Sequence, residues 1–324
     1  MNQEMQDQLN GARNLFFGFL KGVDNQFNIE LPDYVYHYTS VESFYSMVES
    51  DTIRMFTISN FEDQLERKVK LDIESRISGC ITNNETLEKH DFANVVNSAL
   101  SNDHVFIQSN TSTSRNEYLW ENYGNEGKGI CLRISTAKYI TYLEETLEDF
   151  ELLPDYLKCC YISYDEAWLN SFLEMLLPAI QAANPKLNNM PTTIWFFFLE
   201  YWRNFIKSPK PYEEEKEFRF VVSDNFSLFL FFCSQLARWG LFTTKDSDAL
   251  ADTFFSEYRN RKQKLHQQLG FTLTEHSSYV TIPFSSVVDS VLIGPNSTMT
   301  KSDISKGTNY KIRKNQIERM LGHL

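Results

Sequence analysis

The sequence is poor in the residues that mark flexible linkers, and its cysteines follow no disulfide pattern. It has 12 glycines and 9 prolines among 324 residues, too few for long flexible linkers between domains. Its five cysteines form no CxxC motif and no spacing typical of a disulfide framework, and Cys159 and Cys160 are simply adjacent. Free thiols are typical of a reducing compartment, so the composition predicts a cytoplasmic protein.

Several function classes lack their sequence signatures. The apolar runs at residues 194–198 and 228–233 are far shorter than the roughly 20 residues of a membrane-spanning helix, and residues 1–10 lack the apolar core of a signal peptide. No GxxxxGK(S/T) or GxGxxG phosphate loop occurs. No HExxH motif and no cluster of histidines and cysteines occurs either, so we expect no bound metal.

The balance of charge argues against one broad class of partner. The formal net charge is -12, which repels phosphates over most of the surface and disfavours general nucleic-acid binding. A local basic groove stays open, because residues 259–264 read Arg-Asn-Arg-Lys-Gln-Lys. That segment is a solvated helix face or a contact for RNA, DNA or an acidic protein.

The pattern of apolar residues predicts an α+β fold with one central, mostly antiparallel sheet and flanking helices. Ser40 is expected to cap the first helix of the domain, and Ser114 with Glu117 forms a capping box before another. Strands are expected at residues 34–38, 52–58, 104–108, 129–134, 158–164, 215–222, 278–282 and 287–293.

The same pattern predicts one domain with two helical additions. Residues 1–30 are expected to hold an N-terminal helix packed on the main body, and residues 31–324 to form a single α+β domain. Within it, residues 224–277 are expected to contain an inserted helical hairpin, which offers a surface for a protein partner or self-association. Residues 301–320 are expected to close the chain with a helix.

The first candidate site is the aromatic strand that carries His37. Nearly every residue there is bulky, which is typical of a strand buried on both faces. His37 is either a core histidine with a satisfied ring or an imidazole that hydrogen-bonds a ligand hydroxyl, with Tyr38 and Thr39 completing the contact. The sequence leaves both interpretations open.

The second candidate site is the acidic strand predicted at residues 215–222. Strand alternation would place Glu215, Glu217 and Arg219 on one face, where two carboxylates about 7 Å apart repel unless they have partners. One interpretation is a structural ion-pair ladder in which Arg219 neutralises a carboxylate. The other is a catalytic carboxylate that stabilises a positive, oxocarbenium-like centre.

Two helical pairs are further candidates. Asp63 and Glu66 lie three residues apart, either as a helix cap with a solvated acid or as acids of a site. Trp120 and Tyr123 have the same spacing, and they form part of the core or supply a ring that stacks on a planar ligand.

Taken in order, several short motifs resemble a bacterial family known as domain of unknown function 2971. Two positions differ from the family's usual Phe-Asn-Asp-Pro-x-Glu motif, because Glu62 and Gln64 stand where Asn and Pro are common. The family name itself implies no reaction. The matching segments are residues 36–40, 61–66, 119–123, 127–131, 207, 215–219 and 291–295.

A more distant resemblance implies a reaction. A His-x-Thr motif on an early strand with a glutamate on a late strand is similar to the ADP-ribosyltransferase fold, in which the histidine and threonine hold NAD and the glutamate stabilises an oxocarbenium ion. His37 and Thr39 match the first motif, and Glu217 or Glu215 the second. The ring that stacks on nicotinamide has three candidates in this chain: Tyr123, Tyr45 and Trp120.

The sequence therefore favours an NAD-dependent ADP-ribosyltransferase or NAD glycohydrolase, of the kind found among bacterial toxins and phage-defence effectors. NAD would be its substrate, and the acceptor would be a protein or a nucleic acid. One alternative is a non-catalytic binding or regulatory module. Another is a metal-dependent nucleic-acid-processing enzyme built on Asp63, Glu66 and the acidic strand.

Overall fold

The computed structural model describes a β-sheet and the helices that pack on it. The strands are β1 (Tyr34–Thr39), β2 (Thr52–Thr57), β3 (Val105–Thr111), β4 (Ile130–Ser135), β5 (Leu157–Tyr161), β6 (Glu217–Ser223), β7 (Thr272–Leu273), β8 (Ser278–Pro283), β9 (Val288–Ile293) and β10 (Ile317–Arg319). The helices are α2 (Val41–Ser50), α5 (Glu117–Asn122), α6 (Thr136–Thr146), α12 (Phe284–Val287), α13 (Lys301–Gly307) and the 3₁₀ turn η3 (Glu213–Glu215). The described residues are 11, 30–57, 105–147, 157–162, 212–223, 256, 260, 263–264, 266–274, 277–309, 311–312 and 316–319.

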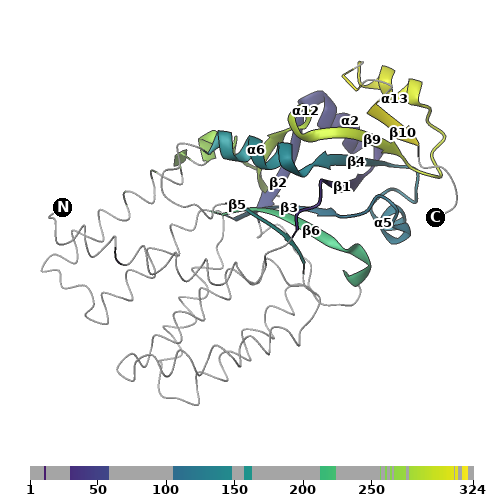
Figure 1. Ribbon diagram of the computed structural model, residues 1–324. Coiled ribbons are helices and arrows are strands. Elements are labelled where there is room, and N and C mark those ends of the chain that lie inside the picture. The colour runs from purple at the N-terminus through teal and green to yellow at the C-terminus, as the bar shows by residue number, and fades with distance from the viewer. Residues whose placement is uncertain are drawn as a thin grey trace, which may run out of the picture.

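The fold is α+β and its sheet branches at β3 (Figure 1). A 10-stranded sheet runs in the order β10-β9-β4-β1-β3-β2-β8-β7, and β6 and β5 extend from β3. Among the described strands the pairs are antiparallel except β9 with β10. Because β6 pairs with β3 along its whole length, β1 and β2 share the other edge of β3.

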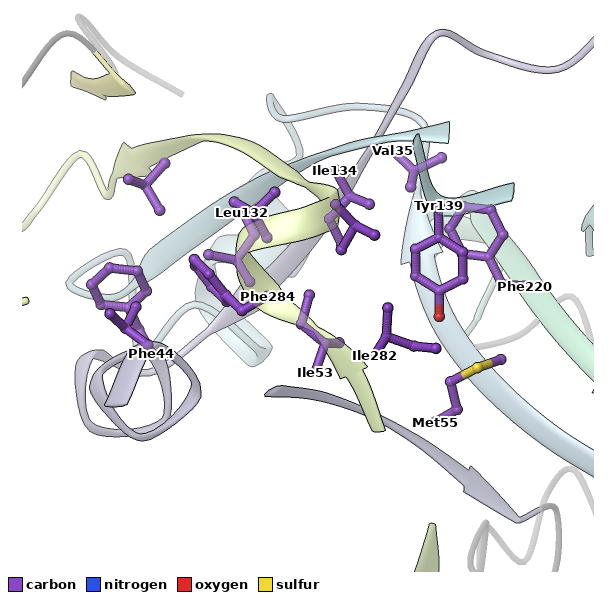
Figure 2. Close-up of a cluster of buried hydrophobic side chains, with 14 of the residues drawn as sticks. Val35, Phe44, Ile53, Met55, Leu132, Ile134, Tyr139, Phe220, Ile282 and Phe284 are labelled. Atoms are coloured by element: carbon purple, nitrogen blue, oxygen red, sulfur yellow. The ribbon is translucent and has the colours of Figure 1, made fainter. Parts of the chain in front are cut away.

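One face of the sheet carries the main core. Phe44 of α2, Phe284 of α12 and Tyr139 of α6 are buried against it, and these helices lie together on that face (Figure 1). The ring of Tyr139 stacks on Phe220 of β6 with centroids 3.9 Å apart, beside Val35 of β1 (Figure 2). Burying each such side chain contributes roughly 1.5–3 kcal/mol, so this cluster joins β1 and β6 to the helices.

A smaller cluster covers the opposite face near α5. Trp120 of α5 contacts Tyr38 of β1 edge to face, with ring centroids 4.8 Å apart, and Cys131 of β4 and Leu292 of β9 join them. The following loop enters β4 through Gly129, where a side chain would collide with the Thr39 carbonyl. Only glycine fits this close approach of two main-chain segments.

The predicted strands are confirmed, with shifted ends, and two further strands were missed. The closing helix expected at residues 301–320 is wrong at residues 317–319, which form β10 and pair with β9, whereas α13 covers Lys301–Gly307. Residues 272–273, at the end of the segment expected to contain the inserted hairpin, form β7 against β8, and most of that segment lies outside the described residues. Of residues 1–30, only 11 and 30 are described, so the N-terminal helix lies outside the described residues.

The helix caps were predicted with mixed success. Ser40 caps α2, since its hydroxyl accepts a hydrogen bond from the Ser43 amide at 3.1 Å. The capping box of Ser114 and Glu117 is wrong, because the Asn116 side chain accepts from the Leu119 amide instead. Within the described residues no helix is long and apolar enough to span a membrane.

Candidate functional site

The two strands singled out in the sequence lie on opposite edges of β3. Tyr36 of β1 pairs with Thr111 of β3, and Thr111 pairs with Glu217 of β6. Paired residues in neighbouring strands project from the same face, so Tyr36, Thr111 and Glu217 form one row. Its outer members are two strand spacings apart, roughly 10 Å between Cα atoms.

The pairing of β1 with β3 is unusually short. It consists of Tyr36 with Thr111, whereas β1 pairs with β4 along its whole length. The other pairs on this edge of β3 are those of Ile107 and Phe106 with β2. Residues 108–110 therefore have no described strand partner on this edge, and we call this opening in the ladder the β1–β3 junction.

The His37 imidazole lies at the β1–β3 junction. Its Nδ1 is 3.1 Å from the carbonyl oxygen of Ser109. Because a carbonyl only accepts, Nδ1 carries the proton of the neutral ring and Nε2 holds the lone pair. Burial lowers the pKa of His37, although the bond to Ser109 opposes part of that shift. His37 is therefore a neutral imidazole at pH 7, with Nε2 as an acceptor.

The side chains of His37 and Glu217 project from opposite faces of the sheet. Glu217 shares the face of Tyr36, and consecutive residues of a strand project to opposite faces. His37 therefore shares its face with Thr39 and with its partner Leu132, which belongs to the main core. A ligand that touches both His37 and Glu217 has to do so around the β1–β3 junction, where the ladder is open.

Glu217 forms a buried ion pair with Arg219. The Arg219 Nε donates to Glu217 Oε1 at 2.6 Å, and Nη2 donates to Oε2 at 3.2 Å. Both side chains are only 3% exposed. The predicted neutralisation of a glutamate by Arg219 is confirmed, and the carboxylate is charged in this arrangement.

Glu215 does not continue the face of Glu217, so the expected alternation is wrong there. Glu215 ends the 3₁₀ turn η3, and Lys216 has a positive φ of 47° before the strand begins. The left-handed conformation of Lys216 interrupts the extended backbone between Glu215 and Glu217, so the two-residue period of a strand does not apply there. Glu215 instead accepts a hydrogen bond from the Tyr123 hydroxyl at 2.7 Å.

The three candidate stacking rings have different environments. Trp120 is fully buried, and its indole N–H donates to the Ser114 carbonyl at 3.1 Å, so it belongs to the core in this conformation. Tyr45 packs against the main core from α2. Tyr123, at the end of α5, is 50% exposed, which leaves its ring the most accessible of the three.

Of the other members of the first candidate site, Tyr38 is part of the framework. Tyr38 is buried and donates to the Thr113 carbonyl at 3.0 Å, and burial raises the pKa of its hydroxyl. Thr39 is buried at the end of β1. The neighbouring Tyr36 is partly exposed, and burial raises the pKa of its hydroxyl while Arg133 opposes the shift.

Two expectations concern acids and metals. Asp63 and Glu66 lie outside the described residues. The part of the chain that the structure describes contains no group of three or more His, Cys, Asp or Glu side chains placed to hold a metal ion.

Three polar residues at this site were missed from the sequence. Gln108 and Asn110 of β3 are buried, with Thr111 beside them, although the strand was predicted to end at residue 108. Gln108 and Asn110 follow Phe106 at two-residue spacing along the strand, so all three side chains project from the core face. Polar side chains at core positions of an alternating strand were the signal that could have found them.

The chain was compared with known proteins in three ways. No protein-family model, curated protein or solved structure matched it.

Proposed function

We propose that this protein is an NAD-using enzyme, either an ADP-ribosyltransferase or an NAD glycohydrolase, with its site at the β1–β3 junction. The observation that carries the proposal is that β1, with His37 and Thr39, and β6, with Glu217, flank the same strand β3. Residues far apart in the sequence thus lie within reach of one dinucleotide. The resemblance of these motifs to the ADP-ribosyltransferase fold supports the same proposal.

The residues have distinct roles in this proposal. His37, as a neutral acceptor at Nε2, holds a ribose hydroxyl, and Thr39 supports the same end of the ligand. Glu217 stabilises the positive charge that develops on the ribose as the bond from C1′ to the nicotinamide nitrogen breaks. Nicotinamide leaves with the electron pair, and water or an acceptor nucleophile adds at C1′ and loses a proton.

The ion pair determines which catalytic role the Glu217 carboxylate can have. A carboxylate bound to Arg219 is charged, so it can stabilise a cation but has no proton to give. Electrostatic stabilisation is worth most in a site from which water is excluded, and Glu217 is almost fully buried. Its carboxylate has to turn from Arg219 toward the ribose when the ligand binds.

The experiment is nicotinamide release from NAD by the purified full chain. The proposal expects release by the wild type and a loss of about 10²-fold or more in Glu217→Gln. Glu214→Gln is the matched control, because Glu214 is exposed and three residues away. Equal release by wild type and Glu217→Gln, or no release and no NAD binding, contradicts the proposal.

A second candidate function is a non-catalytic binding module. The observation that favours it is that Glu217 is already engaged by Arg219, on the face opposite to His37. In that case NAD binds without being cleaved, or does not bind at all. The release assay, combined with calorimetric titration of NAD, separates these outcomes from catalysis.

A further inference from the structure

The β1–β3 junction contains a buried acceptor that the protein leaves unused. Gln108 of β3 is 2% exposed. Its Nε2 donates to the Asn110 side-chain oxygen at 3.3 Å, and Asn110 returns a bond to the Gln108 carbonyl at 3.3 Å. The Oε1 of Gln108 has no hydrogen-bond partner within the described structure. Leaving such an atom unpaired is energetically unfavourable, so its presence in the core needs an explanation.

The unused acceptor lies on the same face as the His37 ring. Thr111 shares the face of Tyr36, so Gln108 and Asn110, at odd spacing from Thr111, share the opposite face with His37. The His37 ring reaches the carbonyl of Ser109, the residue between Gln108 and Asn110. His37 and Ser109 are partly exposed, next to the buried amide.

Gln108 and His37 both present a hydrogen-bond acceptor. Gln108 offers Oε1, and the neutral His37 offers Nε2, and both atoms only accept. An anion such as phosphate brings further acceptors and finds no donor in this pair. A group with two adjacent N–H or O–H donors, by contrast, satisfies both atoms at once.

We propose that Gln108 and His37 together recognise a neutral, doubly donating group of the ligand at the β1–β3 junction, with Gln108 as a specificity-determining residue. The proposal rests on the proposed function for the identity of the ligand. In NAD this chemistry has two sources, the ribose diols and the nicotinamide carboxamide. ADP-ribose carries the diols without the carboxamide, and nicotinamide carries the carboxamide alone.

The test is calorimetric titration of the full chain with ADP-ribose and, separately, with nicotinamide. Gln108→Met keeps the length of the side chain and removes the acceptor, and the exposed Gln267→Leu is the control. The expected result is that wild type and Gln267→Leu bind at least one probe, and that Gln108→Met weakens that Kd about tenfold or more. The unfolding temperature of Gln108→Met, measured without ligand, is expected to stay close to that of the wild type. His37→Met, which removes the ring acceptor, serves as a second variant if Gln108→Met does not fold, and the same loss of affinity is expected for it.

Each outcome is decisive. An unchanged Kd in a folded Gln108→Met, or no binding of either probe by the wild type, overturns the inference and makes Gln108 a structural residue satisfied by solvent. Nicotinamide release from NAD with an unchanged Kd in Gln108→Met leaves the proposed function standing and removes only the inference. If Gln108→Met weakens ADP-ribose binding but the wild type does not cleave NAD, the inference stands and the proposed function is overturned.

Discussion

Glu217 and Arg219 hold each other through two hydrogen bonds while both are almost removed from solvent. They are two residues apart on β6, so the pair lies on one face at the start of that strand. A buried charge is costly when its partner is removed, because its own desolvation is then uncompensated. The pair is therefore central to stability whether or not Glu217 also takes part in catalysis.

The first prediction concerns this pair. Arg219→Met is expected to lower the free energy of unfolding by about 3–5 kcal/mol, because it leaves Glu217 charged and buried. The double variant Glu217→Gln/Arg219→Met is expected to lose clearly less than the sum of the two single variants. Urea denaturation measures both. Lys128→Met, which breaks an exposed pair with Glu126, is the control and should leave the midpoint nearly unchanged. Additive losses in the double variant would show that the two charges are not coupled.

The second prediction concerns the close approach of the loops at the end of β1. A Cβ at Gly129 would collide with the Thr39 carbonyl, and one at Gly294 with the Gly127 carbonyl. Gly129→Ala and Gly294→Ala are each expected to cost about 1–3 kcal/mol or more, because main chain cannot move aside as a side chain can. Gly11→Ala is the control, since Gly11 is helical and nothing lies near its Cβ. It should be neutral or slightly stabilising. Thermal unfolding that ranks all three alike would contradict the role of these close contacts.

The third prediction follows from the lowered pKa of His37. The folded state disfavours the protonated ring, while the unfolded chain takes up a proton as the pH falls below about 6.5. Stability is therefore fully present above that pH and is lost as the pH falls toward the folded pKa, by at most about 1.4 kcal/mol per pH unit. His37→Gln keeps a donor for the Ser109 carbonyl and cannot titrate. Its unfolding free energy between pH 7.5 and 5.5 should fall less than that of the wild type, and parallel curves would disprove the assignment.

The fourth prediction concerns the contact between η3 and α5. The Tyr123 hydroxyl donates to Glu215 at 2.7 Å, and Asn116 donates to the Glu214 carbonyl at 2.5 Å. Tyr123→Phe keeps the ring and removes one of these bonds. A loss of about 1 kcal/mol is expected, because a hydrogen bond to a charged acceptor is strong but Tyr123 is half exposed. Tyr34→Phe, at another exposed tyrosine, should be neutral in the same thermal unfolding assay. Equal effects of the two substitutions would mean that the bond contributes nothing.

Local patterns predicted the strands well because apolar alternation and turn residues are local signals. They failed where pairing across the sheet decides the structure. The polar end of β3, residues 109–111, is held as a strand by β6. Ile317 lies in a strand because β10 pairs with β9. The residues near Ile317 in the sequence do not predict this pairing.

The candidate site was only partly predictable for a related reason. The sequence drew attention to His37 and Glu217, and the register shows that they flank one strand. It could not reveal that Lys216 adopts a left-handed conformation, which takes Glu215 out of the row of Glu217. Strand faces follow from register, and register is a property of the assembled sheet.

Steady-state kinetics of nicotinamide release from NAD separate the two roles on which the proposed function depends. Glu217 is proposed to act on the developing cation and His37 on the bound ribose. Glu217→Gln should therefore lower kcat, while His37→Ala should mainly raise KM. Release by the wild type with this division of effects supports an NAD-cleaving enzyme. Release that is identical in wild type and Glu217→Gln, or no release by a wild type that is folded, contradicts it.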